Sequence, residues 1–141
     1  MKLSALLYVS RSTIPPLDVA AGIDAIVAAA HARNPGLGLT GALLFTGEHL
    51  AQLLEGDERS IDMLLTSLRR DPRHEHLTII DYTSLEERRF PDWSLAYFGP
   101  SQFVSGHITR LLGDPLPSER GRASEWLADL LWEFSVGSGP A

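Results

Sequence analysis

The apolar positions of this chain repeat with two different periods, and each change of period predicts an element. Residues 3–10 are mostly apolar, and the run is followed by Pro15-Pro16, which cannot donate to a β-ladder; this pattern predicts a first strand. From Asp18 onward, apolar residues recur at helical spacing among alanines, which predicts a helix over residues 18–33. We expect Asn34-Pro35-Gly36 to stop this helix, because a residue before proline leaves the helical region.

A β-hairpin and a second helix are predicted next. Two β-compatible runs, residues 39–45 and 49–55, are separated by a three-residue turn, a spacing that is typical of a hairpin. Asp57 is placed to serve as the N-cap of a helix. The apolar residues of that helix recur at helical spacing from Ile61, and the helix is expected to end near Asp71-Pro72.

Two further strands complete the pattern. Residues 77–82 are predicted to form the fourth strand and residues 93–98 the fifth. The alternation along the fifth strand places Trp93, Leu95 and Tyr97 on one face. The order βαββαββ predicts a ferredoxin-like α+β fold, in which a five-stranded mixed sheet carries two helices on one face.

The C-terminal segment is predicted to cover the other face of the sheet. Residues 102–112 and 118–134 have helical spacing, and the second of these helices has an apolar stripe with Trp126 beside it. We therefore expect residues 1–100 to form the main α+β domain and residues 101–141 to form a helical extension that packs on its sheet.

Composition limits the classes of function. The 141 residues suit one domain, and a net charge of −6 without a basic stripe argues against nucleic acid as a partner. The chain has no cysteine, which excludes disulfides and thiolate metal sites, and no histidine pair has the spacing of a zinc site. No segment has the length and hydropathy of a signal peptide or a membrane span, so we expect a cytoplasmic protein without a metal or a membrane partner.

Polar residues on apolar strand faces are the candidates for chemistry. Gln52 shares a strand face with Leu50 and Leu54, and a buried carboxamide there needs hydrogen-bond partners. Tyr8 lies on the first strand, which in this topology is commonly the central neighbour of the third, so the phenol and the carboxamide could bond to each other. Two simpler interpretations stay open: Tyr8 could hold its hydroxyl at the rim of the sheet, and Gln52 could face solvent.

Other polar residues have sufficient structural explanations when they are taken alone. Asn34 is explained as a helix stop, while Arg73 and His74 follow the second helix, where cations complement the helix dipole. The chain has neither a glycine-rich phosphate loop nor a nucleophile elbow, so phosphate binding and serine-type acyl transfer lack support.

Five short motifs follow one another along residues 3–99. They are Leu7-Tyr8-Val9-Ser10-Arg11-Ser12; Arg33-Asn34-Pro35 with Leu39-Thr40-Gly41-Ala42-Leu43-Leu44; Gln52-Leu53-Leu54-Glu55-Gly56; Asp71-Pro72-Arg73-His74; and Arg88-Arg89-Phe90-Pro91-Asp92-Trp93-Ser94. Present together and in this order, they resemble the BLUF family, the blue-light sensors that use FAD.

The resemblance implies a non-covalently bound FAD, whose isoalloxazine ring would lie between the two helices over the sheet. Gln52 would bridge the Tyr8 hydroxyl and the N5 and O4 edge of the ring, and Asn34 would bind its pyrimidine side. The complete set of expected flavin-binding residues is Tyr8, Ser10, Ile26, Arg33, Asn34, Gln52, Leu65, Asp71, Arg73 and His74.

The resemblance also implies a light-driven switch rather than an enzyme. Excited flavin would take an electron and a proton from Tyr8 through Gln52, and their return would leave the glutamine rotated or tautomerised. Trp93 and Leu95 on the fifth strand would relay this change to the surface. The family usually has methionine at the position of Leu95, so this chain keeps the side-chain volume there but lacks the flexible thioether.

Two other interpretations differ in class: a small ferredoxin-like enzyme, such as an acylphosphatase, and a flavin-free protein-interaction module. Residues after position 100 carry no enzyme signature. For the sensor, we therefore expect signalling to another protein, or self-association of the chain through its C-terminal helices. Trp126 and Trp132 lie six residues apart and suggest an exposed aromatic contact on those helices.

Overall fold

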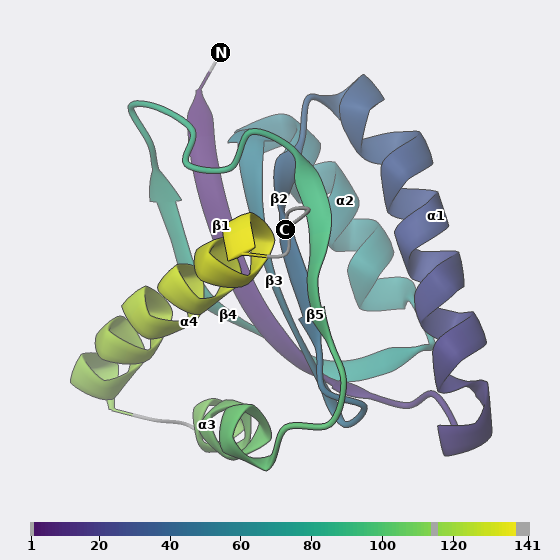
Figure 1. Cartoon of the computed structure of the whole chain (residues 1–141). Coiled ribbons are helices and arrows are strands. Elements are labelled where there is room, and N and C mark those ends of the chain that lie inside the picture. Colours follow the sequence, from purple (N-terminus) through teal and green to yellow (C-terminus); the bar gives the residue numbers. More distant parts are fainter. Residues whose placement is uncertain (1, 114–115, 138–141) are drawn as a thin grey trace.

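The computed structural model describes residues 2–113 and 116–137, and it contains one five-stranded sheet with helices on both faces (Figure 1). The predicted order βαββαββ, followed by two helices, is confirmed. The elements are β1 (Leu3–Ser12), a 3-10 turn (Pro16–Asp18), α1 (Val19–Leu37), β2 (Thr40–Phe45), β3 (His49–Asp57), α2 (Glu58–Arg70), β4 (His74–Ser84), β5 (Trp93–Phe98), α3 (Gln102–Leu112) and α4 (Pro117–Gly137).

The strands lie in the order β4-β1-β3-β2-β5, which is a ferredoxin-like sheet extended by β5 at one edge. All neighbouring pairs are antiparallel except β2 and β5, which are parallel. The central pair of β1 and β3 sets Tyr8 directly opposite Gln52. Because residues that face each other across an antiparallel pair have their side chains on the same face, this register brings the two polar groups together.

Strand alternation divides the hydrophobic core between the two faces of the sheet. One core lies under α1 and α2, and the other lies under α3 and α4 (Figure 1). Along β3, for example, Leu50 and Leu54 belong to the first core while Ala51 and Leu53 belong to the second. The prediction that the C-terminal helices cover the second face is confirmed, with Leu127 and Leu131 of α4 fully buried there. None of the helices among the described residues is long and apolar enough to cross a membrane.

The predicted end of the first helix is wrong, because α1 continues through Pro35 to Leu37. Pro35 lies in the last turn, where a proline removes a single backbone hydrogen bond and leaves most of the helix intact. The helix ends at Gly38, whose φ of 66° is the left-handed conformation of a C-cap; its N–H donates to the carbonyl of Pro35 at 3.1 Å. Asn34 is therefore a helical residue, and it is fully buried.

The predicted common face of β5 is also wrong. Trp93 and Leu95 belong to the core under α1 and α2, whereas Tyr97 packs into the core under α4. The cause is an irregularity in the pairing with β2: Leu95 is opposite Leu43, but the next β2 residue is opposite Tyr97, so β5 has one extra residue. Such a bulge reverses the alternation of the residues that follow it.

Asp57 occupies the predicted N-cap position of α2, but its side chain makes no capping hydrogen bond. The helix is instead tied to the sheet at this end, because the N–H of Glu58 donates to the carbonyl of Lys2 at 3.1 Å. The end of α2 at Arg70, just before Asp71-Pro72, is confirmed.

Gly41 allows the three strands β5, β2 and β3 to approach one another closely. Its φ is +142°, a conformation that side-chain-bearing residues rarely adopt, and a Cβ placed there would lie 1.8 Å from the backbone oxygen of Leu53. Its N–H donates to the carbonyl of Asp92 at 3.0 Å, immediately before β5 begins. This glycine therefore fixes the position of Trp93 against the sheet.

We predict that Gly41→Ala lowers the free energy of unfolding by about 3 kcal/mol or more, since the added methyl group combines backbone strain with a clash against the main chain. Urea unfolding followed by circular dichroism measures this loss. Gly36→Ala is the matched control, because a Cβ at Gly36 in α1 meets no atom within 4 Å and alanine favours a helix. Equal stability of the two variants would contradict the assigned role of Gly41.

Candidate functional site

A buried hydrogen bond joins the two candidate residues at the sheet centre. The Nε2 of Gln52 donates to the hydroxyl oxygen of Tyr8 at 2.6 Å. Tyr8 is 1% exposed and Gln52 is 5% exposed, so both simpler interpretations, a rim tyrosine and a solvent-facing glutamine, are wrong. The alternation on β1 and β3 put both side chains under α1 and α2, and the strand register put them in contact.

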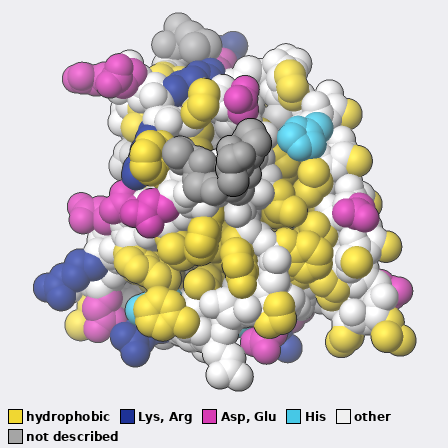
Figure 2. Space-filling model, in the orientation of Figure 1, with side chains coloured by type: hydrophobic (Ala, Val, Ile, Leu, Met, Phe, Trp, Pro, Cys, Tyr) yellow, Lys and Arg dark blue, Asp and Glu magenta, His cyan; other side chains and the backbone are white. Residues whose placement is uncertain are grey.

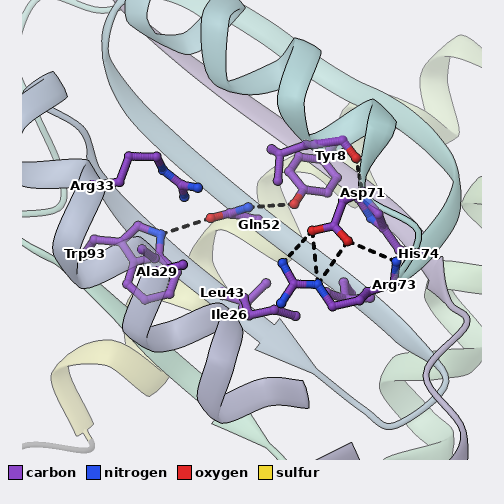
Figure 3. A pocket seen from close by; sticks show the side chains of 13 residues that line it. Tyr8, Ile26, Ala29, Arg33, Leu43, Gln52, Asp71, Arg73, His74 and Trp93 are labelled. Atoms are coloured by element: carbon purple, nitrogen blue, oxygen red, sulfur yellow. Dashed lines mark hydrogen bonds and ion pairs between the residues drawn. The ribbon is translucent and has the colours of Figure 1, made fainter. Parts of the chain in front are cut away.

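The other end of the Gln52 carboxamide is held by Trp93. The indole Nε1 donates to Oε1 of Gln52 at 2.9 Å, and Figure 3 shows Gln52 between Trp93 and Tyr8. An indole can only donate, so the carboxamide oxygen must face Trp93 and its NH₂ group must face Tyr8. The rotamer state of Gln52 is therefore fixed by its two neighbours.

Burial keeps the Tyr8 phenol neutral. Loss of solvent raises the pKa of Tyr8 well above its ordinary value, and the nearby Asp71 carboxylate acts in the same direction. The hydrogen bond from Gln52 and the charge of Arg33 oppose this rise only in part. The phenol thus retains its proton over the whole ordinary pH range.

An ion pair borders the pocket next to Tyr8. The Nε of Arg73 donates to Oδ1 of Asp71 at 2.9 Å, and the Nη2 of Arg73 donates to Oδ2 of Asp71 at 2.6 Å (Figure 3). The hydrogen bonds from Arg73 lower the pKa of Asp71 below its ordinary value, and the same contact raises the pKa of Arg73. Because the pair is bidentate and also uses the backbone N–H of Arg73, its geometry is well defined.

His74 connects the start of β4 to β1 and α2. One ring nitrogen, Nε2, lies 2.5 Å from the carbonyl oxygen of Leu68, and the other, Nδ1, lies 2.7 Å from the hydroxyl of Ser10. Since a carbonyl only accepts, Nε2 carries the proton, and in the neutral ring Ser10 donates to Nδ1. The ring packs edge-on toward Tyr8 with 6.2 Å between centroids, so it forms part of the wall beside the phenol.

Asn34 carries an unsatisfied group in the buried end of α1. Its Oδ1 accepts from Nε of Arg33 at 3.1 Å, but its Nδ2 has no hydrogen-bond partner among the described residues although it is buried. Such a donor normally costs about 1 to 3 kcal/mol, so a ligand acceptor at this place would satisfy a real need. Burial also lowers the pKa of the neighbouring Arg33 guanidinium.

A pocket lies between α1, α2 and the sheet, and most of the predicted flavin-binding residues line it. The lining residues are Tyr8, Ile26, Ala29, Ala30, Arg33, Leu43, Leu50, Gln52, Leu68, Asp71, Arg73, His74 and Trp93. Three predicted flavin-binding residues lie outside this lining: Ser10, which bonds His74; Asn34, which bonds Arg33; and Leu65, which packs against the core beside the pocket. Leu95, predicted as a relay residue, packs against the same core. Apolar walls with a few convergent polar groups are the features of a site for a flat, mostly apolar ligand.

Sequence reasoning missed several lining residues and placed Trp93 only in the relay. Ala29 and Ala30 leave space beside the sheet because they are small, and the alanine-rich composition of α1 was the available signal. Trp93 both lines the pocket and bonds Gln52, and its ring meets that of His31 edge-on at 5.4 Å. Nothing in the fifth strand alone indicated these contacts.

Glu55 is a second residue whose role was missed. Its carboxylate is buried and accepts the backbone N–H groups of Arg89 and Phe90, the latter at 2.7 Å. Arg88 donates to the backbone oxygen of Glu55 at 2.9 Å. These bonds fasten the loop between β4 and β5 to β3, three residues after Gln52. No group of His, Cys, Asp and Glu among the described residues could hold a metal ion.

The family comparison matches the region that contains the pocket. The family model described as BLUF, sensors of blue-light using FAD, matches residues 3–96. The photoactivated adenylate cyclase subunit beta of Euglena longa is 33% identical over 117 residues, which cover 77% of this chain and 13% of that protein. The blue light- and temperature-regulated antirepressor BluF of Escherichia coli (strain K12) is 36% identical over 88 residues, which cover 62% of this chain and 21% of that protein. The chain thus spans less than a quarter of the length of either relative.

Solved structures agree with the fold. The dark-state structure of BlrB, a BLUF protein, has a TM-score of 0.68 and 32% identity, and the match covers 88% of this chain and 97% of that chain. The photo-activated state of BlsA has a TM-score of 0.72 at 20% identity, with 92% and 94% of the two chains covered. At that lower identity, the second match supports the fold alone.

The Asp71–Arg73 pair should make the free energy of unfolding depend on pH in the acid range through the Asp71 carboxyl group. A folded-state pKa below the ordinary value of about 4 means that the pair stabilises the fold above that value and ceases to do so as pH falls through the folded pKa. We expect the stability difference between the protein and Asp71→Asn to be largest near neutral pH and to shrink as the pH falls through the lowered folded-state pKa of Asp71. Urea unfolding at a series of pH values tests this, with the exposed Asp24 as the Asp24→Asn control. Parallel curves for the protein and Asp71→Asn would contradict it.

Proposed function

This chain belongs to the BLUF family of blue-light sensors that use FAD, and on this premise we propose which of its residues bind the flavin, perform the photochemistry and pass on the signal. Membership favours the sensor over the two other interpretations, a ferredoxin-like enzyme and a flavin-free module. The observation that carries the residue assignments is the chain of hydrogen bonds from Trp93 through Gln52 to Tyr8.

The chemistry of the pocket lining between α1 and α2 supports its assignment to the flavin ring. Apolar side chains such as Ile26 and Leu43 offer flat walls, and the unsatisfied Nδ2 of Asn34 is a donor for a ring carbonyl. Arg33 and the Asp71–Arg73 pair, together with His74, place charged and polar groups at the border of the pocket. Ser10 and Leu65 support these residues from behind, Ser10 by holding the His74 ring.

Tyr8 is the electron donor in this proposal, and Gln52 is the path for its proton. Bound FAD, once excited by blue light, supplies the oxidant. Tyr8 would give one electron to the excited flavin. Its hydroxyl proton could leave by way of Gln52 only when the carboxamide oxygen faces the phenol, because the NH₂ group that donates to Tyr8 at 2.6 Å cannot accept a proton. The electron and the proton later return to Tyr8, so no substrate is turned over and the chain acts as a sensor.

The lasting change resides in Gln52. If its carboxamide rotates, Oε1 turns to the Tyr8 hydroxyl and can accept its proton, while the NH₂ group turns to the indole of Trp93. Two donors then face each other, and the buried indole N–H loses its partner at a cost of about 1 to 3 kcal/mol. Tautomerisation would weaken the same bond, because the oxygen that accepts from Trp93 would become a hydroxyl oxygen, which is a poorer acceptor than a carboxamide oxygen.

Trp93 and Leu95 form the proposed relay, because both lie on β5 and pack against the core that includes Gln52's neighbours. A displaced Trp93 shifts the start of β5, and the bulge after Leu95 passes the shift to Tyr97 on the opposite face of the sheet. Tyr97 stacks on Phe134 of α4 with 5.1 Å between ring centroids. The change at the pocket can therefore reach α4 through packed side chains.

For the whole protein, we propose signalling from a cytoplasmic sensor to a downstream protein or through self-association, with residues 1–100 as the flavin-binding domain and 101–141 as the output extension. The curated relatives include an adenylate cyclase subunit and an antirepressor, so outputs differ among them. The exposed Trp132 of α4, which lies 5.4 Å from the Arg89 guanidinium, supports a surface contact through the C-terminal helices.

We predict that Tyr8→Phe still binds FAD and remains yellow but gives no red-shifted state, because the ring fills the same space without a hydroxyl proton to transfer. The measurement is the absorption difference spectrum before and after blue light. Tyr82→Phe is the matched control, since the Tyr82 hydroxyl bonds Asp62 on α2 rather than Gln52. A normal red shift in Tyr8→Phe would refute Tyr8 as the donor.

Self-association has a separate test. Size-exclusion chromatography of the FAD-loaded protein in darkness and under blue light should show a light-dependent change in apparent mass, and Trp132→Ser should reduce that change. Because Trp132 is exposed, the substitution leaves the core intact. Monomers of unchanged mass in both conditions would remove self-association and leave signalling to a different protein.

A further inference from the structure

A cleft lies between α3 and α4, on the face of the sheet opposite the flavin pocket. Its lining residues are His107, Arg110, Leu111, Glu119, Arg122, Ala123 and Trp126. His107, Arg110 and Leu111 lie on α3, and the other lining residues lie on α4, so the cleft runs between the two helices. Its floor is apolar, because Leu111 is buried and Ala123 packs against the same core.

The lining of the cleft carries a small excess of positive charge, two arginines against one glutamate, although the whole chain has a net charge of −6. Arg110 and Arg122 come from opposite walls, and Glu119 is the one carboxylate in the lining. Among the described residues, neither arginine has a carboxylate within ion-pair distance, whereas Arg73 and Arg89 are each paired with an aspartate. Two guanidinium groups on facing walls, neither paired with a carboxylate in the part of the chain that the structure describes, favour an anionic occupant.

An aromatic ridge borders the same cleft. The rings of His107 and Trp126 lie 4.4 Å apart, and Phe103 contacts both, at 4.8 Å and 5.8 Å between centroids. Phe103 is nevertheless 69% exposed. Hydrophobic side chains, a histidine, and both Lys or Arg and Asp or Glu side chains gather at the lower left of Figure 2, the region that α3 and the start of α4 occupy in Figure 1.

Both walls of the cleft are connected to β5. The helix α3 follows β5 after a short loop, and α4 contacts β5 through the stacked pair of Tyr97 and Phe134. In addition, Asp129 of α4 pairs with Arg89 at 2.8 Å, in the loop that Glu55 fastens to β3. A shift of β5 therefore changes how the two walls face each other.

We propose that this cleft is the docking site for a segment of a downstream partner protein that carries acidic side chains beside apolar ones, and that light changes its affinity through β5. The proposal rests on the proposed sensor function and specifies the partner's chemistry. Carboxylates of the segment pair with Arg110 and Arg122, while its apolar side chains cover Phe103 and Trp126. Arginine and large aromatic residues are the types that dominate binding energy at protein interfaces.

The aromatic ridge distinguishes this occupant from a small anion. Inorganic phosphate or a free carboxylate would use the two arginines but would leave Phe103 in water, whereas a peptide covers both features. Charge alone would also permit a nucleic acid, and a second copy of this chain would present acidic residues such as Glu125 and Glu133. Both are tested below as alternative occupants.

The test uses the full FAD-loaded chain and a synthetic helical peptide with glutamates and leucines on one face, labelled with a dye that absorbs to the red of the flavin. Fluorescence anisotropy gives the dissociation constant in darkness and under blue light. We expect binding that weakens with added salt and that changes between the two conditions. A peptide in which lysines replace the glutamates should bind at least about tenfold more weakly.

Variants of the cleft locate the binding site. The double variant Arg110→Glu, Arg122→Glu should weaken binding of the acidic peptide by about tenfold or more, and Phe103→Ser should weaken it by a similar factor. Arg59→Glu on α2, an exposed charge on the other side of the sheet, is the matched control and should leave binding unchanged. All of these variants should retain the red-shifted state, because none of the changed residues touches the flavin pocket.

Several results would overturn the proposal. If the unmodified protein, the double variant and Arg59→Glu bind the acidic peptide with equal affinity, the cleft is not the binding site. If the lysine peptide binds as tightly as the glutamate peptide, the proposed charge recognition is wrong. If labelled single-stranded DNA binds in an arginine-dependent manner and displaces the peptide, the occupant is a nucleic acid. If sedimentation shows that the double variant breaks up a dimer, the occupant is a second copy. Absence of a red shift in the unmodified chain would instead refute the sensor mechanism, and peptide binding in darkness would still test the cleft.

Discussion

The carboxamide of Gln52 is the constraint on which the rest of the site depends, because its two ends are held by groups of different hydrogen-bonding capacity. Trp93 can only donate, so it fixes the oxygen; Tyr8 can donate or accept, so it adapts to whichever end it meets. Because of this asymmetry, the network has one stable arrangement at rest, and any inversion of the amide breaks the hydrogen bond from Trp93. A symmetric pair of partners would tolerate both orientations and would transmit nothing.

Much of this arrangement follows from the sequence because strand alternation and strand order are coarse properties of the hydrophobic pattern. The opposition of Tyr8 and Gln52 needed only the correct pairing of β1 with β3. The errors arose where a single residue changes the geometry. Pro35 fits inside the last turn of α1, and one extra residue in β5 sends Tyr97 to the other face. The role of Glu55 was not predicted because its partners are backbone N–H groups of a distant loop, and a sequence does not show which backbone groups need a partner.

The sheet separates two tasks that would interfere if they shared a face. Photochemistry needs a dry, closely packed pocket in which Tyr8 stays neutral, whereas a partner needs an accessible surface with charge and exposed aromatic rings. In the proposed relay the two sides communicate through β5, because its Trp93 bonds Gln52 and its Tyr97 stacks on Phe134 of α4. Leu95 packs against the same core as Trp93, so in the proposed relay this position contributes side-chain volume without a sulfur atom.

The position of β5 has a consequence for local stability. As an edge strand it shares a ladder with β2 alone, and its bulge interrupts that ladder. Detaching it leaves the four remaining strands paired, so its opening requires less free energy than opening of the central strands, and its amide hydrogens exchange with solvent through smaller fluctuations. The strand that bears Trp93 is thus held by fewer hydrogen bonds than the central strands, so the loss of one bond removes a larger fraction of the interactions that keep it in place.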